Sequence, residues 1–261
     1  MRTKSLLNHL LQASKYSIAL TQVLSVGIMV NVLLTYPITI EHLIMMILGY
    51  ICLAWIGISM FNHRYLSHAS FTTHKVFRYI GITLGALAGR GDPLAWSYVH
   101  RLHHMYADTI KDPHSSNHYT FMQIANPLAM NYADKIDFKI IRDLLRDKYL
   151  VFLSKYYNIM IFGMFMLCLF VPVMTYIWLI PMALTHIALI LFVYYSHRVG
   201  YRNFDIPDNS RNNWLISAIF GGEGWENNHH NDERNPSFKV KPYEFDPVGA
   251  LINTIDRKSV V

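Results

Sequence analysis

The chain has 261 residues, of which 52% are hydrophobic and 15% are charged. Soluble domains usually contain about 25% charged residues, so this composition argues against a water-soluble globular protein. The formal net charge is +6, but the basic residues form no stripe or arm, which argues against nucleic-acid binding.

Four apolar stretches predict membrane-spanning helices, at about residues 17–36, 43–61, 157–174 and 178–196. A helix needs about 20 apolar residues to cross a hydrocarbon core of about 30 Å. Residues 156–197 contain no Asp, Glu, Lys or Arg, and this run of 42 residues is long enough for two crossings. The first stretch is too long for the apolar region of a cleavable signal peptide, so none is expected.

The basic residues predict the orientation in the membrane. Three Lys or Arg residues precede the first stretch, twelve lie between the second and third, and eight follow the fourth, which accounts for all 23. Short cytoplasmic loops are enriched in Lys and Arg. We therefore expect an integral, multi-pass protein with both termini in the cytoplasm, in either the endoplasmic reticulum or a bacterial inner membrane.

The expected fold is a single all-α domain over residues 1–261, with four transmembrane helices and a cytosolic helical cap made of segments 62–156 and 197–261. Residues 79–89 are uncharged but too short to span, which predicts a helix lying against the membrane or within the bundle. Cys52 and Cys168 lie inside apolar runs, as is typical of packing residues.

Residues 134–155 mix charged and apolar side chains. The apolar ones recur at helical spacing, which predicts an amphipathic surface helix. They are Ile136, Ile140, Ile141, Leu144 and Leu145.

Seven of the fourteen histidines fall into three clusters. They are His63 with His68, then His100 with His103 and His104, then Glu226 with His229 and His230. The predicted topology places all three on the cytoplasmic side, just outside the membrane.

The spacing within the clusters indicates metal binding. Positions i, i+3 and i+4 share one face of a helix, so each of the last two clusters can converge on one point. His63 and His68 are five residues apart, about 140° around an α-helix, which predicts that the helix ends or bends near one of them. Neutral imidazole binds first-row transition metals, and nitrogen with some oxygen suits iron. Zinc normally takes four ligands, so eight or more candidates indicate two metal ions.

Isolated histidines usually cap helices or pack in a core. A structural role, or support of a neighbouring ligand, is expected for His74 and His114. Capping or packing is expected for the others, which are His9, His42, His118 and His186.

The clusters and the residues around them resemble the membrane fatty-acyl desaturase family, particularly its acyl-CoA type. The family's three histidine boxes read HxxxxH, HxxHH and HxxHH. The resemblance covers about residues 45–245. It includes four further stretches, which are Gly91–Trp96, Asp108–His114, Ser196–Arg202 and Gly222–His230.

Carried over to matching positions, the resemblance implies eight histidine ligands, which are His63, His68, His100, His103, His104, His197, His229 and His230. It implies a mushroom-shaped fold with two iron ions in the cytosolic cap. A bent, closed tunnel would hold a fatty acyl chain, supplied as acyl-CoA or acyl-lipid. Trp96 and Trp225 would either line that tunnel or only pack beside it.

The resemblance also implies the reaction. The family default is delta-9 desaturation, in which O2 is the co-substrate and a cis double bond is the product. Electrons would come one at a time from a separate protein, cytochrome b5 or ferredoxin.

Two positions depart from the family's pattern. Glu226 stands where the third box usually begins with His, so its carboxylate either ligates iron or hydrogen-bonds to a ligating histidine. Val193, four residues before His197, stands where family members often have an Asn that reaches one metal through water. Both departures bear on the type of reaction.

Three other interpretations stay open at this point. A hydroxylase, an acetylenase or another oxidase on the same scaffold would use the same ligands. A non-enzymatic membrane protein that binds or moves metal predicts histidines along a path inside the spans, whereas these clusters lie outside them. A catalytically silent relative is disfavoured by the eight candidate histidine ligands.

Overall fold

The computed structural model describes residues 2–129 and 137–256, with side chains from residue 11 onward. These residues form helices joined by turns and loops, with isolated β-bridges from Asn212 to Tyr201 and to Trp225. The predicted all-α class is therefore confirmed over the described part of the chain.

Six helices and one π-helix build the bundle and lead into the cap. They are α1 (Arg2–Thr35), α2 (Ile40–Tyr50), the π-helix η1 (Ile51–Ser67), α3 (Lys75–Leu87), α4 (Pro93–Tyr106), α6 (Lys148–Phe170) and α7 (Ile180–Tyr195). The shorter elements are α5 (Phe121–Ala125), η2 (Pro127–Ala129), η3 (Phe138–Ile141), η4 (Leu144–Arg146), η5 (Thr175–Leu179), α8 (Trp214–Ile219), α9 (Glu226–Asn231) and α10 (Pro247–Ile255).

Four helical stretches are long and apolar enough to cross a membrane, at Leu11–Thr35, Ile40–Ser67, Lys148–Phe170 and Thr175–Tyr195. They match the four predicted spans in order, but several boundaries differ. The second stretch continues to Ser67, because α2 runs into η1 without a break.

The third stretch, α6, begins earlier than predicted because Asp147 caps it. The Asp147 carboxylate accepts hydrogen bonds from the backbone N–H groups of Tyr149 and Leu150. The helix ends at Phe170, two residues before Pro172, which cannot continue an α-helix.

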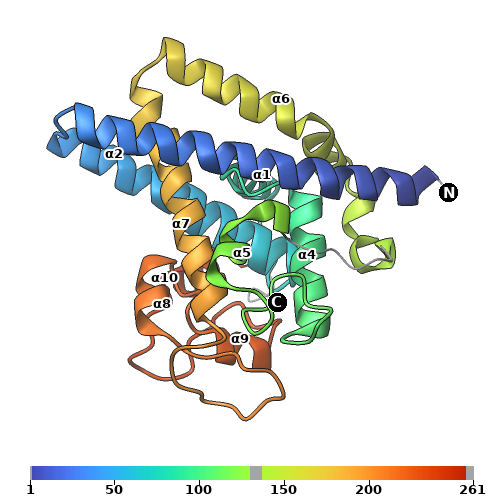
Figure 1. Cartoon of the computed structure of the whole chain (residues 1–261). Coiled ribbons are helices and arrows are strands. Elements are labelled where there is room, and N and C mark those ends of the chain that lie inside the picture. The colour runs from blue at the N-terminus through green and yellow to red at the C-terminus, as the bar shows by residue number, and fades with distance from the viewer. Residues whose placement is uncertain (1, 130–136, 257–261) are drawn as a thin grey trace.

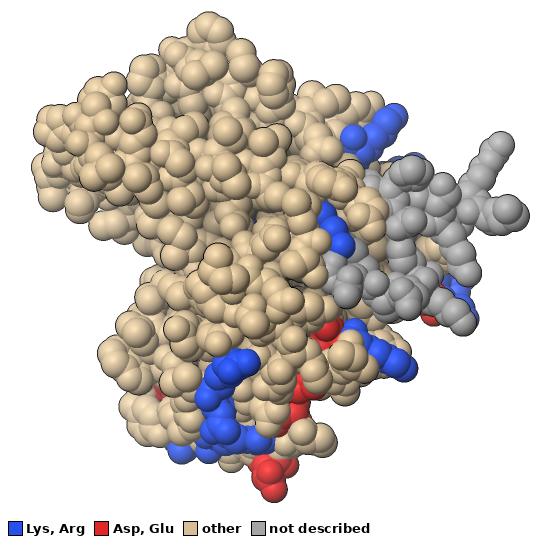
Figure 2. Space-filling model, in the orientation of Figure 1, with Lys and Arg blue, Asp and Glu red and all other residues tan. Residues whose placement is uncertain are grey.

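The outer faces of the long helices carry exposed apolar side chains. Leu34 is 82% exposed, Phe170 is 77% exposed and Ile40 is 73% exposed. Figure 2 shows the upper left part of this face covered by uncharged residues, with Lys, Arg, Asp and Glu toward the right edge and in the lower part. Such a division suits helices in lipid below which a charged cap lies in water.

Helix α3 occupies the place predicted for a short helix within the bundle and packs along η1. The two helices approach closely where Gly57 faces Gly85. A Cβ atom on Gly57 would lie 2.7 Å from the backbone nitrogen of Gly85, so any larger residue would force the helices apart.

The single amphipathic helix predicted for residues 134–155 is wrong. Residues 134–136 lie outside the described part, and the rest forms two 3-10 turns, η3 and η4, followed by the start of α6. Asp137 and Asp147 interrupt the helix because each caps a new element with its own carboxylate. Ile141 and Leu144 are nevertheless buried in the core.

In Figure 1, α1 and α6 run along one side of the molecule. Helix α7 descends from the left-hand ends of α1 and α6 in this view to a C-terminal cap, where α8, α9 and α10 lie together. Cys52 and Cys168 are both free thiols, as expected of packing residues.

Candidate metal centre

The first two candidate ligands, His63 and His68, stand at the end of η1. Residues five apart hydrogen-bond to each other in a π-helix, and the N–H of His68 donates to the carbonyl of His63 at 3.2 Å. The two imidazoles therefore lie on one face of the helix and meet edge to face, with ring centroids 5.0 Å apart. The α-helical separation of about 140° does not arise, and His68 is also the cap at which the helix ends.

Helix α4 supplies His100, His103 and His104. It begins at Asp92, whose buried carboxylate accepts from the N–H groups of Leu94 and Ala95, and Pro93 takes the first helical position. This fixed start sets the rotation of α4, and the face at i, i+3 and i+4 points toward η1 and α9.

Helix α9 is short and supplies Glu226, His229 and His230. The N-cap residue of α9, Trp225, makes no capping hydrogen bond with its side chain. Asn212, in a distant loop, caps the helix in its place. The Asn212 Oδ1 atom accepts from the backbone nitrogens of Asn227 at 3.1 Å and Asn228 at 3.3 Å. The loop after α7 thereby fixes the position of the third cluster.

Five imidazoles form the first group of potential ligands, with one nitrogen from each lying within 4.8 Å of all the others. They belong to His63, His68, His100, His104 and His229. The Nε2 atoms of His68 and His100 are 2.7 Å apart, and those of His63 and His229 are 2.9 Å apart.

Several of these rings turn their Nδ1 atoms toward carboxylates. The Nδ1 of His63 hydrogen-bonds to Glu223, and the Nδ1 of His104 lies 3.4 Å from Glu233. A proton on Nδ1 leaves the Nε2 lone pair directed at the other rings. Converging lone pairs repel one another, and a cation between them removes the repulsion.

The second group contains His103, His197, Glu226 and His230. The Oε1 atom of Glu226 lies 3.2 Å from Nε2 of His230 and 3.7 Å from Nε2 of His197. Among the described residues, three buried atoms here have no hydrogen-bond partner, which are Nε2 of His103, Nε2 of His197 and Oε2 of Glu226. Unsatisfied buried polar atoms are costly, and a metal ion with these ligands would satisfy all three.

A ring of carboxylates supports the second group from behind. The Nδ1 atoms of its three histidines each lie 2.9 Å from an aspartate oxygen. The pairs are His103 with Asp112, His197 with Asp108 and His230 with Asp208. Such partners fix the tautomer and the ring orientation of metal-binding histidines.

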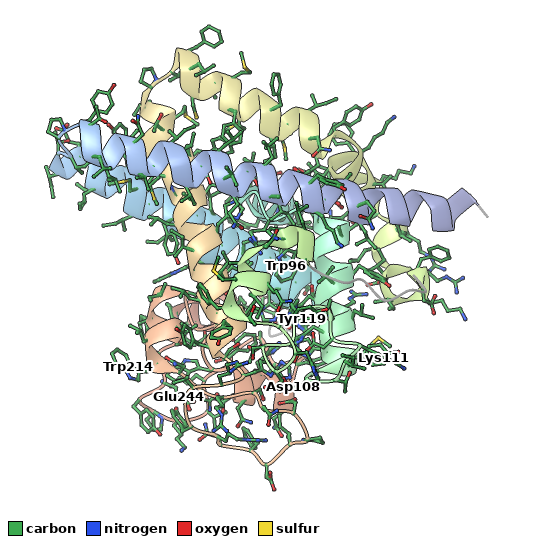
Figure 3. All side chains as sticks on the ribbon, in the orientation of Figure 1. Trp96, Asp108, Lys111, Tyr119, Trp214 and Glu244 are labelled. Carbon is green, nitrogen blue, oxygen red and sulfur yellow. The ribbon has the colours of Figure 1, made fainter. Side chains whose placement is uncertain are left out.

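No role was predicted from the sequence for these aspartates or for Glu223. Three of these residues, Asp108, Asp112 and Glu223, lie in stretches that the family resemblance had already marked, so position beside a histidine box was the available signal. Figure 3 places Asp108 in the loop region beyond α4, below Trp96.

The surroundings of three imidazoles of the first group favour their neutral form. Burial lowers the pKa values of His100, His104 and His229, and the neighbouring histidines lower them further. Neutral imidazole is the form that binds metal.

In the second group the carboxylates favour positive charge. Burial alone raises the pKa of Glu226, but the neighbouring imidazoles of His197 and His230 outweigh it, so the net shift is downward and the carboxylate stays ionised. Burial alone lowers the pKa of His230, but Asp208 and Glu226 raise it to about 10. The same carboxylates that hold a proton on His230 would attract a metal cation in its place.

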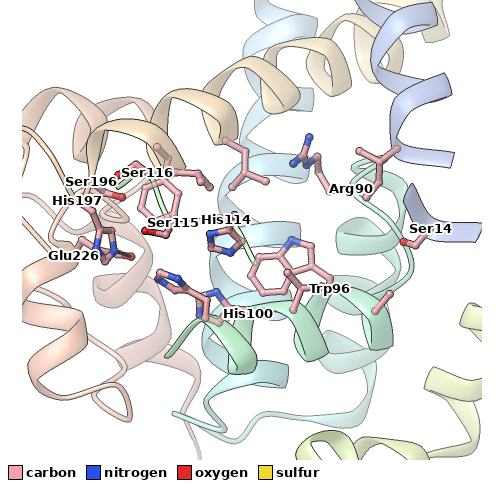
Figure 4. A pocket seen from close by; sticks show the side chains of 17 residues that line it. Ser14, Arg90, Trp96, His100, His114, Ser115, Ser116, Ser196, His197 and Glu226 are labelled. Carbon is pink, nitrogen blue, oxygen red and sulfur yellow. Dashed lines mark ion pairs between the residues drawn. The ribbon is translucent and has the colours of Figure 1, made fainter. Parts of the chain in front are cut away.

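A mainly apolar cavity of about 80 Å³ reaches the second group. Figure 4 shows Ser196, His197 and Glu226 at one end of its lining and Arg90 and Ser14 at the other, with Trp96 between them. Val193 also lines the cavity.

The two tryptophans occupy different positions. Trp96 lines the cavity and stacks on His100, with ring centroids 5.1 Å apart. Trp225 is not part of that lining; it is buried, and its Nε1 donates to the carbonyl of Phe245 at 2.9 Å. Of the two alternatives for Trp225, the structure favours packing.

The isolated histidines mostly have the roles expected. The rings of His74 and His42 cap α3 and α2, and His186 is buried in the bundle. His114 lies beside His103, with ring centroids 4.5 Å apart, and lines the cavity. The side chain of His9 lies outside the described part.

Comparison with known proteins matches residues 41–243 to the fatty acid desaturase family. The chain belongs to the fatty acid desaturase family. The matched residues contain both groups of potential ligands and the cavity beside them.

Individual relatives agree with this family. The chain is 32% identical over 190 residues to an sn-1 stearoyl-lipid 9-desaturase of Anabaena variabilis, covering 67% of this chain and 66% of the relative. It is 35% identical over 182 residues to the Delta-9 acyl-lipid desaturase 1 of Arabidopsis thaliana, covering 67% of this chain and 59% of the relative.

A third relative is a hex-5-enoyl-[acyl-carrier protein] acetylenase of Moorena producens, 27% identical over 257 residues, with 87% of this chain and 77% of the relative covered. The chain thus spans about three fifths to two thirds of the length of the first two relatives.

Proposed function

We propose that this protein is a membrane fatty acyl desaturase that introduces a cis double bond into a saturated acyl chain. The observation that carries the proposal is the convergence of two groups of ligand atoms beside an apolar cavity. The whole chain, residues 1–261, would act as one domain, with both termini and the cap on the cytoplasmic side.

The nine residues of the two groups would bind two iron ions, one in each group. Bound iron supplies the activation of O2, a reaction that side chains do not perform unaided. The overall reaction consumes the acyl chain, O2, two electrons and two protons, and yields the alkene and two molecules of water.

The side chains around the metals have separate tasks. The three aspartates hold the Nδ1 protons of His103, His197 and His230, which keeps each Nε2 available as a ligand. Trp96 and the apolar wall position the acyl chain, and regioselectivity depends on which carbon lies nearest the metals. An acyl chain bound against this mainly apolar lining would exclude water from the reacting carbon.

The substrate is proposed to be an acyl-lipid, and the position delta-9, because the first two relatives carry those names. Acyl-CoA is the alternative substrate, because a further relative is named an acyl-CoA 5-desaturase. Cytochrome b5 or ferredoxin, as a separate protein, would supply the electrons one at a time.

The acetylenase is a second candidate. The acetylenase of Moorena producens matches a larger share of this chain than the two 9-desaturases do. An acetylenase on this scaffold would use the same metal ligands. The products differ in mass and in chemistry, since an alkyne carries two fewer hydrogens than the alkene.

Product analysis tests the proposal. The purified protein would receive a saturated acyl substrate, O2 and a reducing donor, and the products would be identified by gas chromatography and mass spectrometry. We expect an alkene from the wild type, none from His103→Ala, and an unchanged amount from His42→Ala, whose ring caps α2 and lies outside both groups. Equal turnover by His103→Ala and the wild type would contradict the proposal.

A further inference from the structure

The cavity has a cationic end that the reaction does not require. Arg90 lies in the loop between α3 and α4 and is only 7% exposed. It lines the same cavity as His103 and Glu226, at the opposite end from His197 (Figure 4). Ser14 of α1 stands beside it in the lining.

The backbone on either side of Arg90 is held in place. Gly89 and Gly91 have φ values of +75° and +89°, a conformation that favours glycine. Thr21 of α1 donates its hydroxyl to the carbonyl of Gly89 at 3.0 Å, and the N–H of Gly91 donates to the hydroxyl of Tyr157 at 3.1 Å. The loop is therefore fixed to α1 and α6.

Two uncharged side chains help to orient the guanidinium. Its Nη1 atom lies 3.2 Å from Nδ1 of His186 on α7 and 3.5 Å from Oε1 of Gln22 on α1. Gln22 is in turn tied to α5, because its Nε2 donates to the carbonyl of Ala125 at 2.8 Å. Three helices thus fix one arginine at the wall of the cavity.

An arginine in such a place affects what the cavity can bind. Most of the remaining lining is apolar, with Ile18, Val99, Leu189 and Phe192 among its residues. A methyl-terminated chain pressed against a guanidinium would strip water from the charge and give no hydrogen bond in return. A carbonyl, carboxylate or hydroxyl oxygen would accept one, and hydrogen bonds to charged groups are among the stronger ones.

We propose that the Arg90 end of the cavity binds an oxygen-bearing end of the substrate's acyl chain. Two parts of an acyl substrate could supply this oxygen. One is the carbonyl that joins the chain to its carrier, and the other is an oxygenated far end of the chain. The proposal rests on the proposed function only in taking the occupant to be an acyl chain.

Three ligands of equal chain length separate the sources. They are hexadecane, ethyl hexadecanoate and ethyl 16-hydroxyhexadecanoate, and binding to the metal-loaded protein in detergent is followed by tryptophan fluorescence without O2 or a donor. If the carbonyl is bound, the ester binds about ten- to hundredfold more tightly than the alkane. If the far end is bound, the hydroxy ester binds more tightly than the plain ester by a similar factor.

The variants assign the gain to Arg90. Arg90→Met should remove the gain while leaving the affinity for hexadecane in place, and Arg90→Lys should keep part of it. Arg202→Met, a partly buried arginine outside the cavity lining, should leave all affinities unchanged. Retention of the gain in Arg90→Met, or equal binding of the three ligands by the wild type, would overturn the proposal. If none of the three ligands bound the wild type, both this proposal and the proposed function would be contradicted.

Discussion

The Nδ1 atom of His197 lies 2.9 Å from Oδ2 of Asp108, although 89 residues separate the two in sequence. Asp108 follows α4 and has a φ of +62°, a left-handed conformation that Asp and Asn tolerate better than most residues. Its carboxylate also accepts from the N–H of Asn209 at 2.6 Å. One side chain therefore joins the loop after α4 to the two segments beyond α7.

Asp108→Asn should weaken metal binding without disturbing the fold. The amide keeps the size of the side chain and tolerates the left-handed backbone, but it gives His197 a weaker acceptor. We expect the affinity of one metal to fall about 10- to 100-fold, measured by competition with a chelator. The exposed Asp205 serves as the control, and an equal loss in Asp205→Asn would show that the effect is not specific to the His197 contact.

Glu226→Ala should remove one of two metals. Glu226 is the only carboxylate in the second group of ligands among the described residues, and its Oε2 atom has no other partner there. We expect the iron content to fall from about two to about one per chain.

Glu226→His is the matched rescue variant, since it restores the imidazole usual in the family. It should keep both irons and raise the reduction potential, because a neutral ligand stabilises Fe(III) less than a carboxylate does. Full iron content in Glu226→Ala would rule out a ligand role for Glu226.

Asp246→Ala should destabilise the folded protein by about 3–5 kcal/mol, because it leaves a buried charge without one of its partners. Arg64 is fully buried, and its Nη2 atom lies 3.1 Å from Asp246 and 3.5 Å from Glu223. Thermal unfolding in detergent measures the effect. Asp143→Ala removes an exposed partner of Arg101 and should cost no more than about 1 kcal/mol. Similar losses in the two variants would contradict a special role for the buried pair.

Gly91→Ala should destabilise the protein by about 1–3 kcal/mol, because the backbone there is left-handed. An added Cβ would also lie 2.2 Å from the Oγ of Ser14 and push α1 away from the cavity. Gly27→Ala is the control on α1, the helix that carries Ser14. A Cβ atom at Gly27 would meet nothing within 4 Å, so this variant should raise the stability by about 0.5–1 kcal/mol. Unfolding of both variants in one detergent gives the comparison, and an unchanged stability in Gly91→Ala would refute the close approach of α1.

The four spans could be predicted because each depends on local composition alone. The clusters on α4 and α9 could be predicted for a similar reason, since i, i+3 and i+4 share a face of any α-helix. The alignment of His63 and His68 was harder to predict, because it depends on a π-helix. Tertiary packing decides whether a π-helix forms, and no simple spacing of residues indicates one.

Contacts between distant segments were not predictable in this way. The hydrogen bond between His63 and Glu223 and that between Arg90 and His186 each join elements that the sequence does not place side by side. The helix predicted for residues 134–155 failed because apolar periodicity took no account of aspartates that cap new elements at 137 and 147.

The central claim is that the two groups of ligands bind two iron ions. Metal analysis by mass spectrometry on the wild-type protein, purified in mild detergent and compared with the protein concentration, tests it most directly. We predict about two irons per chain. Negligible iron, or zinc in stoichiometric amounts in its place, would contradict the account.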